Sequence, residues 1–247
     1  MENNFYESER NLENLESLEG ESLSRYTAKT FFIMFIGLMI SFGVALFIAD
    51  TWPGYYLYWD LVRMTGGYLH IILLVAQLAL AFGMSAAIRK STVGATWGFF
   101  LAHCALIGLV VGAWLMLFDL ESAVLAFAMT ALCFGGMAVF GYFTQVDLSR
   151  LRNFLLCGLV FLILANVLMW FIPAIEAYDQ IICTIGIVLF LAYAAYDTQM
   201  IRRLYEGFRG DGEMLKKASV YAALQLCLDF VNLFLYILRL LGRRSRN

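Results

Sequence analysis

Seven long apolar segments dominate this 247-residue chain. Each is about 20 residues long, which is the length that a helix needs to cross the hydrocarbon core of a bilayer. Hydrophobic residues make up 62% of the chain and charged residues only 15%, which is more apolar surface than a soluble domain of this size can bury. A transmembrane strand would need only about ten residues and would alternate polar with apolar side chains. The sequence therefore predicts an all-α membrane protein with seven transmembrane helices.

Short connections join the expected spans, which predicts a single compact domain. The spans cover residues 30–49, 68–88, 93–118, 122–143, 154–172, 181–201 and 218–241. We therefore expect a transmembrane domain over residues 25–242. Residues 1–24 place seven glutamates among Asn, Ser and single Leu residues, a composition typical of a disordered acidic tail. Residues 243–247 form a short basic tail.

Basic residues gather at alternate connections, and this predicts the orientation. Cytoplasmic connections of membrane proteins carry an excess of Lys and Arg. One side holds Arg10, Arg25, Lys29, Arg89, Lys90, Arg150, Arg152, Arg202, Arg203, Arg209, Lys216 and Lys217, whereas the other side holds Arg63. The amino terminus is therefore expected in the cytoplasm. Seven spans would export the basic residues from Arg239 onward, so six spans with a re-entrant or protein-enclosed last helix stay open as an alternative.

Two aspartates lie inside apolar segments, Asp197 in the sixth span and Asp229 in the seventh. A carboxylate near the centre of a membrane helix costs about 2.5 to 3.5 kcal/mol on insertion scales, so such residues are usually functional. Consecutive helices with a short connection run antiparallel and usually touch. Two carboxyl groups in contact in a poorly hydrated place cannot both ionise freely, and they can share one proton. This pair is predicted to sense protons and to line an ion pathway.

The depths of the two aspartates constrain how they could meet. At the helical rise, Asp197 lies about 7 Å from the boundary at Arg202, and Asp229 about 18 Å from the boundary at Lys217. The depths agree only if residues 212–221 lie along the membrane surface and the seventh helix is short. We expect that arrangement. An unbroken seventh helix with the carboxyl groups more than about 10 Å apart would exclude the pair.

Other polar residues in the spans are secondary candidates. His103 could relay protons because imidazole titrates near neutral pH, or it could simply bond a neighbouring helix. Asn232 follows Asp229 by one turn and is a further candidate for the pathway. Cysteines occur singly in five different spans, so we interpret them as small buried apolar residues, without a zinc site or structural disulfide. They are Cys104, Cys133, Cys157, Cys183 and Cys227.

Three segments carry a family resemblance. They are Gly-Tyr-Phe-Thr-Gln-Val-Asp-Leu-Ser at 141–149, Ala-Tyr-Asp-Thr-Gln-Met-Ile at 195–201, and Leu-Asp-Phe-Val-Asn-Leu-Phe-Leu-Tyr-Ile-Leu-Arg-Leu-Leu-Gly at 228–242. They closely resemble the transmembrane Bax inhibitor motif family, and the resemblance spans residues 25–242. It implies a fold in which six helices surround a short central seventh. It also implies a pH-sensitive calcium leak in a bacterial or organellar membrane, here the bacterial inner membrane.

The resemblance also implies roles for individual residues. In that family an aspartate pair on helices six and seven carries the pH response, and it corresponds to Asp197 and Asp229. A basic residue at the cytoplasmic end of helix two latches the closed form by pairing with the helix-six aspartate. Arg89 is the nearest match, because an Arg fork can hold a carboxylate in bidentate fashion. An ordinary positively charged anchor at the membrane surface is the alternative for Arg89.

Calcium needs six to eight oxygen ligands, so Asp197 and Asp229 could form only a weak, transient Ca²⁺ site. Weak binding suits conduction. We expect the lipid bilayer, calcium ions and protons as partners, with no nucleic acid, no resident cofactor and no enzymatic activity. One alternative is an intramembrane aspartyl protease, although the Gly-x-Gly of such enzymes is replaced here by Leu226-Cys227-Leu228. Another is a non-conducting stress-regulatory membrane protein that acts through partners.

Overall fold

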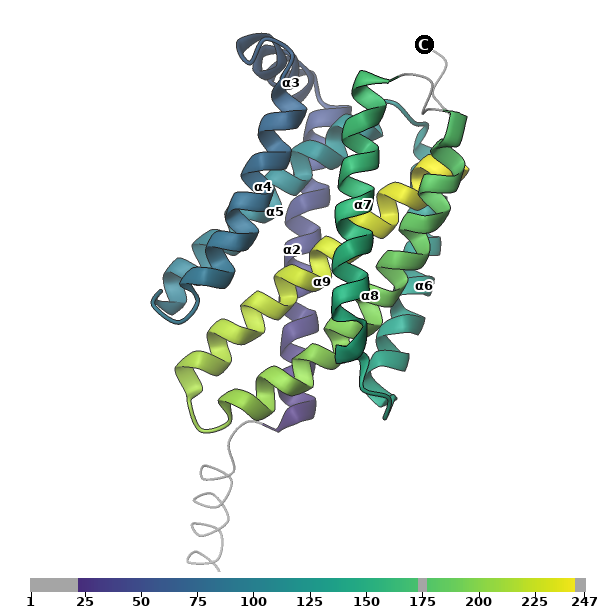
Figure 1. Cartoon of the computed structure of the whole chain (residues 1–247). Helices are drawn as coiled ribbons and strands as arrows, with labels where there is room; N and C mark the ends of the chain where they lie inside the picture. The colour runs from purple at the N-terminus through teal and green to yellow at the C-terminus, as the bar shows by residue number, and fades with distance from the viewer. Residues whose placement is uncertain (1–21, 173–176, 243–247) are drawn as a thin grey trace, which may run out of the picture.

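The computed structural model describes residues 22–172 and 177–242, and it is a bundle of long helices (Figure 1). The elements are α2 (Leu23–Asp50), α3 (Trp52–Met64), α4 (Leu69–Ala87), α5 (Val93–Leu115), α6 (Leu120–Phe143), η1 (Leu148–Leu151), α7 (Arg152–Phe171), α8 (Asp179–Phe208) and α9 (Gly212–Leu241). These two ranges contain no strand, and the predicted all-α membrane class is confirmed. The predicted tails lie almost entirely outside the described residues, since residues 1–21 and 243–247 are not among them.

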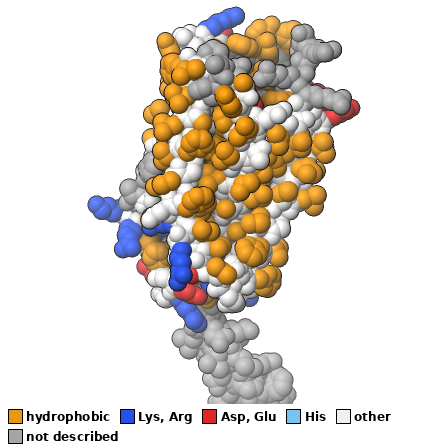
Figure 2. All heavy atoms as spheres, turned by 45° about the vertical axis from the view of Figure 1, so that its right-hand side comes forward, with side chains coloured by type: hydrophobic (Ala, Val, Ile, Leu, Met, Phe, Trp, Pro, Cys, Tyr) orange, Lys and Arg blue, Asp and Glu red, His pale blue; other side chains and the backbone are white. Residues whose placement is uncertain are grey.

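The number of candidate membrane spans agrees with the prediction. Within the described ranges six helices are long and apolar enough to cross a membrane, namely α2, α5, α6, α7 with η1, α8 and α9. The pair α3 and α4, bent by 92°, would supply a seventh. Figure 2 shows hydrophobic side chains spread over the flank of the bundle and charged ones near its ends. This distribution suits a protein whose sides contact lipid.

Helix α3 occupies a segment for which no helix was predicted. The Thr51 side chain accepts a hydrogen bond from the backbone N–H of Gly54 at 3.1 Å, and Pro53 stands in the first turn. Both features favour the start of a helix. Tyr58 then packs with Leu69 and Leu73 of α4 in a small separate core. The connection between the first two spans is therefore helical, because it has its own cap and its own apolar contacts.

Helix α9 is the most buried candidate span, as expected of a central helix, but it is not short. It contacts α2, α5, α6 and α8, and 61% of an apolar 18-residue stretch of this helix is buried. The prediction that residues 212–221 lie along the membrane surface is wrong, because α9 runs unbroken for 30 residues. Asp211 caps the helix by accepting hydrogen bonds from the N–H groups of Glu213 and Met214, and Ala218 and Val220 are already buried.

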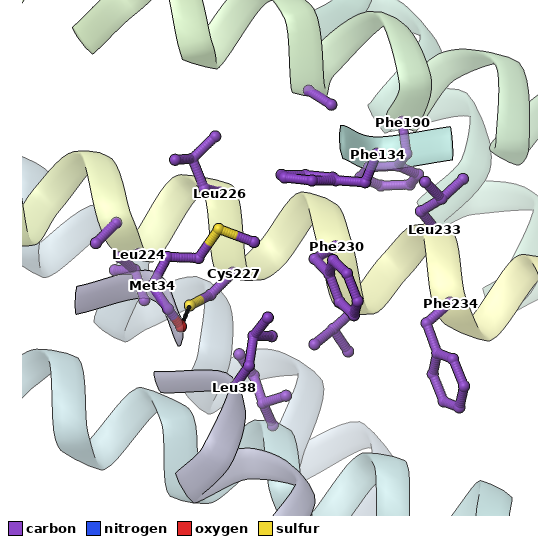
Figure 3. Packing of buried hydrophobic residues seen from close by; sticks show 14 of the residues in the cluster. Met34, Leu38, Phe134, Phe190, Leu224, Leu226, Cys227, Phe230, Leu233 and Phe234 are labelled. Atoms are coloured by element: carbon purple, nitrogen blue, oxygen red, sulfur yellow. Dashed lines mark hydrogen bonds between the residues drawn. The ribbon is translucent and has the colours of Figure 1, made fainter. Parts of the chain in front are cut away.

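Small and aromatic residues set how closely the helices approach. A Cβ on Gly108 of α5 would lie 2.5 Å from Cβ of Val44 and 2.7 Å from the Ser41 carbonyl oxygen, so α2 and α5 pack here at backbone distance. On α9, Phe230 packs edge-on against Phe134 of α6, with ring centroids 5.5 Å apart. Figure 3 shows these rings with Cys227 and Leu233 in one apolar cluster. This packing fixes which faces of α9 point towards α2, α5 and α6.

The positions of the first and last helix ends agree with the predicted number of spans. Figure 1 shows the start of α2 and the end of α9 at opposite ends of the bundle. Termini on opposite sides need an odd number of crossings, so the arrangement suits seven spans with α3 and α4 as one bent crossing. Which end faces the cytoplasm stays a prediction from the basic residues.

Candidate functional site

Asp197 of α8 and Asp229 of α9 come together inside the bundle. Their side chains lie next to one another, and the residues are 6% and 4% exposed. Two carboxyl groups held this close in a buried place can share one proton. One oxygen, Oδ2 of Asp229, is buried and has no hydrogen-bond partner among the described residues. We call Asp197 and Asp229 the carboxyl pair.

The two carboxyl groups meet although α9 is unbroken. The depth calculation assumed helices that stand upright in the membrane. Figure 1 shows instead that α9 crosses the bundle obliquely, so residues at unequal distances from the connection reach one position. The turn between the helices contains Gly210 at φ 105°, a conformation that glycine adopts without strain. The pair thus forms without a break in α9, and α8 also continues to Phe208, past the boundary assumed at Arg202.

Arg203 is a basic residue near Asp197 on α8 that the sequence interpretation did not single out. It follows Asp197 by six residues on α8, and its guanidinium carbon lies 5.2 Å from the centroid of the Tyr196 ring. Its Nη1 lies 3.8 Å from Oδ1 of Asp147, while Nε and Nη2 are buried without a hydrogen-bond partner in the described part of the chain. In the sequence Arg203 looked like one more basic residue at a helix end.

Three further side chains belong to this region. Tyr193 lies one turn before Asp197 on α8. Asp147 lies outside the spans, in the connection between α6 and α7, where hydrogen bonds from Ser149 and, to a smaller extent, the Arg203 charge lower the pKa of its carboxyl group. Gln199 fixes the same connection, because it accepts from the N–H of Leu148 at 2.9 Å and donates to the Val146 carbonyl at 2.8 Å.

A known protein family matches this chain over nearly its whole length. The sequence pattern of the family described as "Inhibitor of apoptosis-promoting Bax1" matches residues 23–246, which include every described helix and both aspartates. The chain belongs to this Bax inhibitor-1 family.

Bacterial relatives of the Bax inhibitor-1 type match nearly the whole chain. "Inner membrane protein YbhL" of Escherichia coli K12 is 34% identical over 223 residues, which cover 90% of this chain and 93% of that protein. Uncharacterized proteins of Borreliella burgdorferi and Deinococcus radiodurans are each 33% identical, over 91% of this chain and 94% and 93% of their own lengths. The chain is an integral, multi-pass membrane protein of this family.

Arg89 is not brought to the carboxyl pair. It is exposed in the turn after α4, and within residues 22–172 and 177–242 it forms no ion pair with Asp197. The buried cation of this region is Lys217 of α9, whose Nζ donates to the Ser91 carbonyl at 3.1 Å and lies 3.2 Å from Oε1 of Glu213. Lys217 thus ties α9 to the turn between α4 and α5. The latch of the closed form at Arg89 stays a prediction.

Neither secondary polar candidate forms a hydrogen bond to the carboxyl pair among the described residues. His103 of α5 is fully buried, and neither ring nitrogen has a hydrogen-bond partner among the described residues. Asn232 donates to the Leu228 carbonyl of its own helix at 2.8 Å. The roles of His103 and Asn232 in a pathway stay predictions.

A second buried polar group occupies the opposite end of α9. Arg239 forms an ion pair with Asp179 of α8, donates to Oδ1 of Asn166 at 2.8 Å, and lies over the Trp114 ring at 5.4 Å. The sequence interpretation counted Arg239 as a free charge of the exported tail. In the structure its charge is compensated, which removes part of the conflict with seven spans. We call these four residues the Arg239 cluster.

The described residues do not build a strong metal site. No group of three or more His, Cys, Asp or Glu side chains that could hold a metal ion occurs in the described ranges. The carboxyl pair offers two carboxyl groups in a buried place. Calcium prefers six to eight oxygen ligands, so this donor set suits a passing cation, with water or backbone carbonyls as further ligands.

Proposed function

We propose that this protein is a pH-sensitive leak pathway for calcium or a similar cation in a bacterial inner membrane, controlled by the carboxyl pair and without enzymatic activity. The observation that carries the proposal is the direct contact of two buried carboxyl groups on consecutive membrane helices. Membrane proteins place acids in such positions for proton relays and ion pathways. The relative "Inner membrane protein YbhL" of Escherichia coli supports the inner membrane as the location.

The contact links protonation to helix position. While the pair holds one proton, the two groups can share it, and this joins α8 to α9. Loss of that proton leaves two negative charges, which at about 4 Å and an effective dielectric constant of about 20 repel by about 4 kcal/mol. A free energy of this size is enough to shift a two-state equilibrium by several hundredfold. The proton content of the pair would thus decide how α9 sits against α8.

The same groups suit a passing cation better than a stored one. Two carboxylates attract a divalent ion into the bundle, while the small number of oxygen ligands keeps the binding weak. The orphan Oδ2 of Asp229 supplies an acceptor that a water or a cation can use. We expect the basic connections, with the amino terminus, on the cytoplasmic side.

Calcium flux tests the proposal. Flux into proteoliposomes is measured between about pH 6 and pH 8, the range in which a perturbed carboxyl pair can titrate. We expect the parent protein to show pH-dependent flux, and Asp197→Asn and Asp229→Asn to lose that dependence, because neither variant can share a proton between two carboxyl groups. Asp60→Asn, which removes an exposed carboxylate of α3, is the matched control and should keep the parent profile. Identical profiles for all four proteins would refute the role of the pair.

The same preparation separates the alternative functions. An aspartyl protease would cleave a reporter membrane peptide and lose cleavage in Asp229→Asn. The segment before Asp229 argues against this, because Leu226 and Cys227 are fully buried, where a protease needs close access for a substrate backbone. A non-conducting regulatory protein would show neither flux nor cleavage at any pH. We expect flux and no cleavage.

A further inference from the structure

Cys104 of α5 and Cys227 of α9 meet in the core although they are far apart in the sequence. Both residues are fully buried, and their side chains face the same glycine of α2. A Cβ placed on Gly37 of α2 would lie 2.9 Å from the Cys227 sulfur and 3.0 Å from the Cys104 sulfur, so the two sulfur atoms are less than 6 Å apart. We call Cys104 and Cys227 the cysteine pair. The sequence could not show this contact, because each residue stands alone in its span.

The surroundings of the cysteine pair hold α2, α5 and α9 together. Gly37 leaves the space that the two sulfur atoms occupy, since a side chain there would also lie 2.6 Å from Phe100. The Ser41 hydroxyl lies 2.9 Å from the carbonyl oxygens of both Gly37 and Cys104, which joins α2 to α5. The position of the Cys104 backbone is therefore fixed relative to α2. Close, well-fixed thiols on different helices are a precondition for a disulfide.

The Cys227 thiol has a second contact that depends on its hydrogen. It donates to the Met34 carbonyl oxygen at 3.3 Å, and Figure 3 shows this bond between α9 and α2. A disulfide sulfur has no hydrogen to donate. Oxidation would therefore remove a contact of α9 with α2 and add a covalent link of α9 to α5. The reduced protein would hold α9 to α2 through this hydrogen bond, and the oxidised protein would hold α9 to α5 through the disulfide.

We propose that the cysteine pair is an oxidisable dithiol, which a peroxide converts into a disulfide that links α5 to α9. One sulfur attacks the O–O bond of hydrogen peroxide and becomes a sulfenic acid, with release of one water. The second sulfur then displaces the sulfenic hydroxyl, which leaves as a second water, and the S–S bond forms. The two thiols lose two hydrogens and two electrons, and the peroxide takes up both. A thiol reductant reverses the reaction by exchange.

The link would act on the proposed pathway through α9. Cys227 precedes Asp229 by two residues on the same helix, and the carboxyl pair is buried in the conformation that brings the thiols together. A disulfide would hold α9 in this arrangement and so restrain the movement that the proposed function requires. This consequence rests on the proposed function, whereas the oxidation itself does not. Since burial slows thiol oxidation, the response is to sustained peroxide exposure.

Thiol counting tests the pair directly. The full-length protein in proteoliposomes is treated with hydrogen peroxide, denatured and labelled with a maleimide reagent that adds a fixed mass to each free cysteine. The parent, with five cysteines, should lose two reactive thiols together, recover both with dithiothreitol, and yield a cross-linked peptide joining α5 to α9. Cys157→Ser, which changes an exposed cysteine of α7, should behave in the same way. Cys104→Ser and Cys227→Ser should yield no such peptide.

Several outcomes would overturn the inference. Retention of all five thiols in the parent, or a cross-link between other cysteines, would refute the redox pair. Calcium flux in the same vesicles, with and without peroxide, separates the two proposals. We expect peroxide to remove most of the parent's flux and dithiothreitol to restore it, with no such change in Cys104→Ser. A disulfide without calcium flux in any of the proteins would refute the leak but not the redox pair. Flux without a disulfide would refute the redox pair but not the leak.

Discussion

At the residue scale, Asp197 is a buried carboxyl group with a cation nearby on its own helix. Arg203 follows it by six residues, and two of the Arg203 guanidinium nitrogens are buried without hydrogen-bond partners in the described part of the chain. A nearby cation favours the ionised form of a carboxyl group. Arg203 therefore helps to set the pH at which the carboxyl pair takes up its extra proton, a role that the sequence interpretation had given to Arg89.

Replacing Arg203 should move the pH profile of flux. In Arg203→Gln the ionised form loses its stabilising charge, so the pair takes up a proton at higher pH. We expect the midpoint of the flux profile to rise by about half a unit to one unit, where one unit corresponds to about 1.36 kcal/mol. Asp147→Asn is the control, because it removes the ion pair with Arg203 but keeps the cation. A midpoint that stays in place in Arg203→Gln would contradict this role.

At the scale of the elements, α9 owes its length to contacts at its first turns. Lys217 reaches the Ser91 carbonyl from a position where its side chain is only 5% exposed, and this bond joins α9 to the turn between α4 and α5. A charged group in a buried hydrogen bond contributes about 1.5 to 3 kcal/mol. The sequence interpretation took the same residue for a boundary charge at the membrane surface.

The Lys217 contact predicts a difference between two neighbouring lysines. Lys217→Met should lower the free energy of unfolding by about 1 to 3 kcal/mol, because the Ser91 carbonyl loses its donor. Lys216→Met, which changes an exposed residue, should leave stability within about 0.5 kcal/mol. Unfolding of both variants in mixed detergent, followed by circular dichroism, measures the difference. Equal stabilities would show that the contact does not hold α9 in place.

At the scale of the whole molecule, the start of α2 and the end of α9 lie at opposite ends of the bundle, and this predicts the topology. With the amino terminus in the cytoplasm and seven crossings, the carboxyl terminus is exported. A fluorescent protein fused before residue 1 should therefore fluoresce in the cytoplasm, and alkaline phosphatase fused after residue 247 should be active. The exchanged fusions are the controls and should both be silent. A fluorescent carboxyl-terminal fusion together with an inactive alkaline phosphatase fusion at residue 247 would instead favour six crossings.

The sequence predicts much of this architecture, and it fails where geometry between helices matters. Run lengths predict the class and the number of spans, because hydrocarbon thickness fixes helix length. The contact of Asp197 with Asp229 follows from their placement on consecutive helices. The length of α9 was mispredicted because its tilt is set by packing against α2, α5 and α6. The same holds for Cys104 and Cys227, whose meeting depends on how each helix is rotated about its axis.

The Arg239 cluster has a consequence for how the protein is made. A ribosome delivers α8 before α9, and an isolated α9 would have to carry an uncompensated guanidinium across the bilayer. Asp179 at the start of α8 neutralises that charge only when both helices are present. We expect the translocation machinery to insert them as one hairpin, with the arginine already matched to its acid.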